Sequence, residues 1–132
     1  MKKLIIALFA VVALQACTKD LATMSTTDTK WVLTEWPGKM LPTSAKATLD
    51  ISGGNKINGK SFCNSYGGNA VINGSAIQFT NTFATKMYCA DVARAEDQYL
   101  ADLNKVRAGK VSGDKLHFYN DGVLLMTFSK AK

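Results

Sequence analysis

The sequence predicts an α+β domain, either an antiparallel sheet or a small open barrel of short strands, with one helix packed on it. Three observations support this fold class. Short segments rich in strand-forming residues recur along the chain, separated by turns that contain glycine and asparagine. One of these turns, Asn73-Gly74, is among the strongest short hairpin signals. The segment from about Asp91 to Val106 instead spaces its apolar residues three or four apart, the period of a helix.

The first expected strands precede this hairpin. Residues 30–36, KWVLTEW, are rich in strand formers and end at a Pro-Gly turn. Residues 45–51 alternate apolar and polar side chains, as a half-buried antiparallel strand does. Residues 56–64, KINGKSFCN, are the expected return strand, with Gly59 as a candidate bulge.

The later strands form the Asn73-Gly74 hairpin and a C-terminal meander. Turn signals separate their expected segments, which are 68–74, 75–81, 107–113, 115–120 and 122–130. In the expected helix, one face carries Val92, Ala95, Tyr99, Leu103 and Val106. Asp91 is the expected N-cap, while Glu96 and Asp97 lie on the polar side.

The chain begins with the pattern of an export signal. Two lysines precede an apolar run, Leu4 to Leu14, which is too short to span a membrane as a helix. The sequence LQAC that follows resembles a bacterial lipobox. It predicts a signal peptide over residues 1–16 and lipidation of Cys17, although Gln15 departs from the usual small residue. The alternative is an ordinary signal peptide that leaves Cys17 as a spare thiol.

Residues 17–29 are polar and rich in threonine, so we expect a tether between the lipid anchor and a single domain over residues 30–132. The net charge is +6 for the whole chain and +4 without Lys2 and Lys3. The remaining basic residues are scattered, with no run of three. This pattern argues against a nucleic-acid partner.

If Cys17 carries lipid, Cys63 and Cys89 remain as a pair, and an exported chain favours a disulfide between them. Such a bond would fix the start of the helix to the sheet. The alternatives are weaker. A zinc site would need more ligands than these cysteines and His117, a catalytic thiol would have only His117 as its base, and the spacing is not Cys-x-x-Cys.

The segments GKSFCNSYGG and TKMYC, followed by a helix with a glutamate, resemble the META domain family of HslJ-like bacterial envelope lipoproteins. The matching residues are Gly59, Cys63, Asn64, Tyr66, Gly68, Thr85, Met87, Cys89 and Glu96. Trp31, Leu33 and the segment GDKLHFYNDGVLLMTF extend the similarity over most of residues 30–129. The resemblance implies a small α+β domain with the two cysteines bridged, and it implies no defined activity. It links the chain to envelope stress, antibiotic tolerance and secretion.

No catalytic set emerges from the sequence, so we expect no enzyme, no metal and no cofactor. His117 lies on an expected strand between inward-facing Leu116 and Phe118. The acidic residues of the helix, including Asp102, are expected to face water or the helix N-terminus. Phosphate-loop, zinc-protease and serine-hydrolase motifs do not occur.

Two features near the cysteines have alternative roles. Asn64 is expected to bond to the backbone of a turn, with ligand contact as the alternative. Thr85, Met87 and Tyr88 are expected to pack under the helix, with an exposed lip as the alternative.

Two classes of function follow. The first is a non-catalytic envelope lipoprotein that binds or supports another envelope component, a protein or lipid, and an inhibitor of proteases is a variant of this class. The second is a carrier that holds a small molecule or lipid inside a partly open barrel. An open groove beside the helix favours the first, and an enclosed apolar cavity favours the second. Thr18 after Cys17 favours the outer membrane over the inner membrane.

Overall fold

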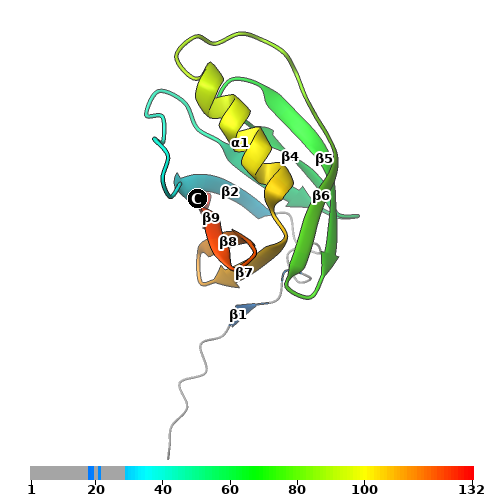
Figure 1. Cartoon of the computed structure of the whole chain (residues 1–132). Helices are drawn as coiled ribbons and strands as arrows, with labels where there is room; N and C mark the ends of the chain where they lie inside the picture. Colours follow the sequence, from blue (N-terminus) through cyan, green and yellow to red (C-terminus); the bar gives the residue numbers. More distant parts are fainter. Residues whose placement is uncertain (1–17, 20, 22–28) are drawn as a thin grey trace, which may run out of the picture.

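The computed structural model describes residues 18–19, 21 and 29–132 (Figure 1). The expected signal peptide and Cys17 lie outside the described residues. The described part contains β1 (Thr18–Lys19), β2 (Thr29–Glu35), β3 (Thr48–Ser52), β4 (Lys56–Lys60), β5 (Ser65–Asn73), β6 (Ala76–Ala84), α1 (Ala93–Lys105), β7 (Ala108–Ser112), β8 (Lys115–Asn120) and β9 (Val123–Lys130). None of the helical segments among these residues has the length and apolar character needed to cross a membrane.

The strands form one antiparallel sheet that curves into a ring. Their order is β1-β7-β6-β5-β4-β3-β2-β9-β8, and β8 also pairs with β7, the strand next to β1, which closes the ring. The contact between β6 and β7 is short, with one residue pair, Ala76 with Ala108, and hydrogen bonds from Ile77 N–H to Arg107 O (3.1 Å) and from Gly109 N–H to Ser75 O (2.9 Å). The arrangement is therefore ring-like rather than clearly a barrel, and α1, which links β6 to β7, packs on it (Figure 1). The predicted α+β class is confirmed.

The interior of the ring is filled by apolar side chains. The inward-facing residues of β8 and β9, Leu116, Phe118, Met126 and Phe128, have no exposed surface. The buried face of α1 contributes Tyr99 and Leu103. The alternation of apolar and polar residues in strands such as β8 therefore predicted the inward face correctly.

The prediction of a β-bulge at Gly59 is wrong. The pairing of β4 with β5 continues without a shift through Gly59, which lies opposite Tyr66. The register shift occurs on β5 instead, between Gly67 and Asn69. Gly59 is needed for a different reason. A Cβ atom there would lie 2.1 Å from the backbone oxygen of Thr48, far inside van der Waals contact.

The helix begins later than predicted and is not capped by Asp91. α1 starts at Ala93, and its N-cap residue, Val92, makes no side-chain capping bond. The side chain of Val92 is buried in the core instead. Packing thus fixes this end of the helix where a cap was expected.

The described part of the expected tether belongs to the fold. Thr18 and Lys19 pair with Ser112 and Val111 of β7, and Leu21 is only 1% exposed. Leu21 fits here because Gly109 has no side chain. A Cβ atom on Gly109 would lie 3.0 Å from Leu21 Cδ1. The polar composition of this segment did not indicate that Leu21 packs into the core.

Candidate functional site

A buried carboxylate joins α1 to the turn between β4 and β5. Glu96 is 8% exposed and accepts hydrogen bonds from Ser61 Oγ (2.9 Å), from the backbone N–H groups of Cys63 (3.2 Å) and Asn64 (2.7 Å), and from Asn64 Nδ2. The expectation that Glu96 lies on the polar side of the helix is therefore wrong. The donors of the turn balance the cost of burying the charge.

The hydrogen bonds keep this carboxylate ionised. Burial alone raises the pKa of Glu96, but the bonds from Asn64, Ser61 and Cys63 outweigh burial and hold the pKa below its ordinary value of 4.5. An acid with a lowered pKa and its lone pairs taken by fixed donors is a poor general acid or base at neutral pH. Glu96 is a structural anion.

Asn64 carries the same connection onward to the segment before α1. It is 2% exposed, and its Oδ1 accepts from Thr85 Oγ1 (2.9 Å) and from the backbone N–H of Met87 (2.7 Å). Its Nδ2 donates to the backbone oxygen of Met87 (3.0 Å). The side-chain amide of Asn64 thus bonds to both the N–H and the C=O of Met87. Asn64 therefore has the backbone-bonding role expected of it.

The disulfide predicted between Cys63 and Cys89 is present. The Cα atoms of the two cysteines lie 5.9 Å apart, within the usual range for a disulfide. The bond adds a covalent link beside the Asn64 contacts. The backbone of residues 85–89 is therefore held to the turn before β5 at Thr85, at Met87 and at Cys89.

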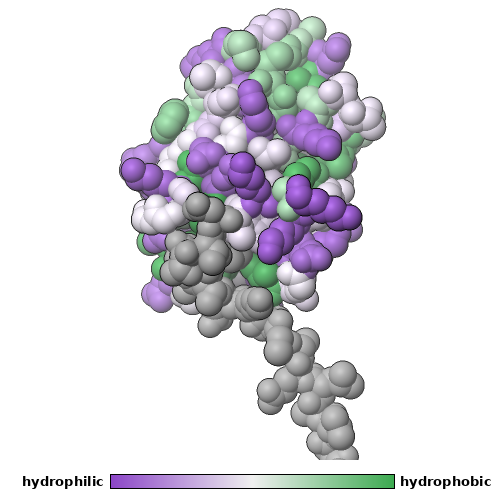
Figure 2. All heavy atoms as spheres, turned by 180° about the vertical axis from the view of Figure 1, so that it is seen from behind, coloured by the Kyte–Doolittle hydropathy of each residue, from purple (hydrophilic) through white to green (hydrophobic). Residues whose placement is uncertain are grey.

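Large apolar side chains are exposed on this fixed segment and on the end of β6 that precedes it. Phe83, Met87 and Tyr88 are 70%, 62% and 82% exposed. We call residues 83–88 the lip. The expectation that Thr85, Met87 and Tyr88 pack under the helix is wrong, since all three are exposed. Asn64 and the disulfide hold the backbone of this segment against the turn before β5 and leave its side chains outside the core. In Figure 2 pale green hydrophobic residues lie among purple ones at the upper end, where Figure 1 places the loop that leads into α1.

Two buried tyrosines join β5 to α1 and to β3. Tyr66 donates its hydroxyl to the backbone oxygen of Thr48 (2.7 Å) and shares a 2.8 Å hydrogen bond with the hydroxyl of Tyr99. Burial raises the pKa of both tyrosines, so they stay un-ionised. Phe83 lies over Gly67, where a Cβ atom would be 2.8 Å from its ring.

Residues 20–132 match the family model of the META domain. The chain belongs to the META domain family. No curated protein matches it significantly. An NMR structure of a protein from Burkholderia xenovorans is similar, with a TM-score of 0.72 and 25% identity, covering 84% of this chain and 87% of that one. A second NMR structure of a protein has a TM-score of 0.59 at 16% identity, covering 76% and 87%, and shares the fold alone.

The motif residues of this META domain fall into two structural groups. One group holds the lip and α1 to the turn before β5, and it consists of Cys63, Asn64, Thr85, Met87, Cys89 and Glu96. The other group permits close packing of strands, and it consists of Gly59, Tyr66 and Gly68. A Cβ atom on Gly68 would lie 2.9 Å from the backbone oxygen of Thr80. The sequence indicated these residues by their family pattern, but not what they contact.

The sequence missed a second buried acid in the META domain. Asp102 accepts from Trp36 Nε1 (3.0 Å), pairs closely with Lys39 and contacts Lys105 Nζ (3.5 Å). Burial raises its pKa, but these partners outweigh burial and lower it overall. The contacts attach the loop after β2 to α1. Between them lies an open groove of about 620 Å³, lined by residues 38–44 and by Asp91, Arg94, Ala95 and Gln98.

His117 lies apart from the lip, on the outer face of β8. Its Nδ1 atom is 2.9 Å from Thr127 Oγ1. Leu116 and Phe118 on either side are buried, as predicted. Within the described residues no group of three or more histidine, cysteine or acidic side chains is placed to hold a metal ion.

Proposed function

We propose that this META domain is a non-catalytic lipoprotein of the bacterial cell envelope that binds a partner protein through the lip. The observation that carries the proposal is the exposure of Met87 and Tyr88 on a backbone fixed by Asn64 and a disulfide, next along the chain from exposed Phe83 near the end of β6. Exposed apolar groups that gather in one place mark interaction sites more often than apolar groups scattered singly do.

The rigidity of the lip matters for affinity. Binding costs free energy when loops and side chains become ordered, and a segment held in place before binding avoids part of this cost. Aromatic residues are enriched among the side chains that dominate protein interfaces, and methionine adapts to irregular surfaces. Lys86, exposed between these residues, favours a partner whose apolar pocket has acidic residues at its edge.

A carrier function has less support. The interior of the ring is filled by residues such as Phe118, Met126 and Phe128, which are fully buried. The groove beside α1 is open, and an open groove is the arrangement we associated with binding a partner. A protease is one class of partner that would fit, since a rigid exposed loop is what a protease inhibitor presents. The test below would identify it.

Replacing Met87 and Tyr88 together by serine should weaken partner binding by about 30-fold, the effect expected when residues that dominate an interface are truncated. A photo-crosslinking amino acid at Tyr88 in intact cells would first identify the partner. Binding of the purified partner would then be measured by calorimetry. Because both side chains are exposed, the thermal stability of the variant should change little.

Val123 provides a matched control. It is 63% exposed, nearly the same exposed fraction as Met87, and it is the first residue of β9, outside the lip. A crosslinker at Val123 should not capture the same protein, and Val123→Ser should leave binding unchanged. Equal capture at both positions, or full binding by the Met87→Ser/Tyr88→Ser variant, would contradict the proposed site.

The proposed membrane attachment rests on the sequence LQAC and on Cys17. Changing Cys17 to serine should move the protein from the membrane fraction to the soluble fraction, because the acyl chains would be absent. Mass spectrometry of the mature protein provides the direct measurement. A mature form without acyl mass would show that Cys17 is a free thiol. The outer membrane remains the proposed location, on the basis of Thr18.

A further inference from the structure

The fold grips the chain immediately after the proposed lipid attachment site. Thr18 pairs with Ser112 and Lys19 with Val111, while Leu21 is buried in the core against Gly109. We call this contact the clamp. Cys17 precedes Thr18 directly, so the Cα atoms of the two residues are about 3.8 Å apart. A free tether over residues 18–29 would instead reach about 40 Å from the membrane when extended.

Lysines surround the point where the chain enters the clamp. Ser112, the partner of Thr18, pairs with Lys115, which in turn pairs with Ser129. The backbone N–H of Lys130 bonds to the backbone oxygen of Asp114 (2.8 Å), which brings the end of β9 to the same place.

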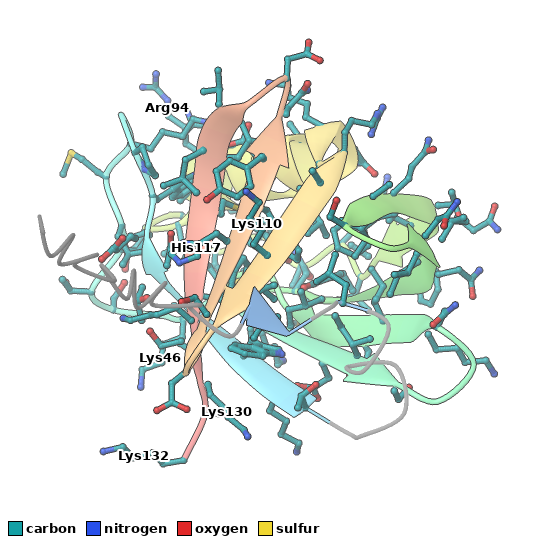
Figure 3. All side chains as sticks on the ribbon, turned by 90° about the horizontal axis from the view of Figure 1, so that it is seen from below. Lys46, Arg94, Lys110, His117, Lys130 and Lys132 are labelled. Atoms are coloured by element: carbon teal, nitrogen blue, oxygen red, sulfur yellow. A yellow bond between two sulfur atoms is a disulfide. The ribbon has the colours of Figure 1, made fainter. Side chains whose placement is uncertain are left out.

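The exposed lysines of this region are Lys110, Lys115, Lys130 and Lys132, which we call the anchor face. Figure 3 views the domain from the side of β1, with Lys110 labelled close to that strand and Lys130 and Lys132 at the lower left of the same view. Asp114 is the one acidic side chain among residues 108–118 and 127–132. An excess of lysines fits a membrane surface that carries anionic lipid.

The lip lies at the other end of the molecule. β6 meets β7 through Ala76 and Ala108, and the two strands are antiparallel. β7 continues from Ala108 to Ser112 in one direction, while β6 runs in the opposite direction toward Phe83, about 26 Å for its nine residues. In Figure 1, β1 lies at the bottom of the molecule and the loop into α1 at the top.

We propose that the clamp holds the domain against its own membrane with the anchor face on the lipid headgroups, so that the lip points away from the membrane. This arrangement rests on the proposed lipid anchor at Cys17. In this arrangement Thr18, Lys19 and Leu21 orient the domain, although the composition of residues 17–29 suggests only a linker. The lip would meet a partner at a fixed height and orientation rather than at the end of a flexible tether.

The test is paramagnetic relaxation measured by NMR on the mature chain attached through Cys17. In the oxidised protein Cys17 is the one free thiol, so it can be coupled to a maleimide lipid in a nanodisc of phosphatidylethanolamine and phosphatidylglycerol. A gadolinium-chelating headgroup then broadens the amide signals nearest the membrane. Signals of residues 113–115 and 130–132 should be broadened, and signals of residues 85–88 should persist. Broadening of the lip, or uniform broadening, would overturn the proposal.

Two variants test the cause of this orientation. Leu21→Asp should release the clamp and make the broadening uniform, while Leu21→Met should keep the original pattern. Lys115→Glu/Lys130→Glu changes only exposed residues and should reduce broadening of the anchor face. This variant tests the proposal independently if Leu21→Asp does not fold. An unchanged pattern in a folded Leu21→Asp variant and in the lysine variant would overturn the proposal.

Because Cys17 is coupled to the lipid chemically, the orientation can be tested separately from the proposed lipoprotein function. The nanodisc experiment reports orientation whether or not cells acylate Cys17. If the mature protein carries no acyl mass but shows the expected broadening, the lipoprotein function fails and the geometry of the clamp stands. If the protein is acylated and the broadening is uniform, the function stands and the clamp fails.

Discussion

Replacing Glu96 by alanine should lower the free energy of unfolding by about 3–5 kcal/mol, a large part of the total for a domain of this size. The change removes the acceptor for Ser61 Oγ, for two backbone N–H groups and for Asn64 Nδ2. The N–H groups of Cys63 and Asn64 lose this acceptor, at a cost of about 1–3 kcal/mol each. Ser61 Oγ and Asn64 Nδ2 keep bonds to backbone oxygens, which limits the loss. Urea denaturation followed by circular dichroism would measure the loss.

Two variants give this result its control. Glu96→Gln keeps the shape of the side chain and one acceptor oxygen, so it should lose less stability than Glu96→Ala. Asp97→Ala changes the neighbouring acid, which is exposed, and should have a small effect. If Glu96→Ala is as stable as Asp97→Ala, then the bonds to Glu96 do not hold α1 to the turn.

The same carboxylate makes stability depend on pH. The folded-state pKa of Glu96 is lowered from its ordinary value of 4.5, so its contribution is present above that value and is lost as pH falls through the folded pKa. The pKa of Asp102 is also lowered, and it acts in the same direction. The loss of stability below about pH 4.5 should therefore be smaller in Glu96→Gln, which keeps Asp102 but lacks the Glu96 carboxyl.

The sequence predicted those parts of the fold that depend on local patterns. Alternation along β8 identified Leu116 and Phe118 as inward-facing, and the Asn73-Gly74 signal located the hairpin of β5 and β6. Helical spacing found α1 with an error of two residues at its start. Each of these features is determined by neighbours within a few positions along the chain.

The errors concern contacts between distant segments. Glu96 has the position of a surface residue on a helical wheel, and its burial depends on donors from a turn 32 residues earlier, at Asn64. The exposure of Met87 follows from the same turn. Leu21 docks because Gly109, far along the chain, leaves it space. A single sequence records each residue but not which distant residue it will meet.

The three cysteines were an exception, because their number limits the pairing. With Cys17 assigned to lipid, a disulfide could join only Cys63 and Cys89, and the structure contains it. The sequence alone did not reveal what the bond accomplishes. Together with Asn64, it presents the side chains of Met87 and Tyr88 to solvent, which links a stabilising feature to the proposed binding surface.

Removing this disulfide should produce the second large effect. The variant Cys63→Ala/Cys89→Ala should lose about 3–4 kcal/mol, because the bond closes a loop with a sequence separation of 26 and thereby restricts the unfolded chain. The corresponding fall in Tm is about 15–25 °C for a domain of this size. Calorimetry of the mature protein and of the variant, both without reductant, would measure it.

Amide exchange at Met87 would show whether the bond also positions the lip. The N–H of Met87 donates to Asn64 Oδ1, a contact that the disulfide variant retains. If Asn64 holds the lip by itself, this amide exchanges only as global unfolding allows, and Asn64→Ala then removes its protection while the disulfide is intact. If the Met87 amide instead exchanges well before global unfolding in the disulfide variant, the covalent bond fixes the lip, and partner binding should weaken along with stability.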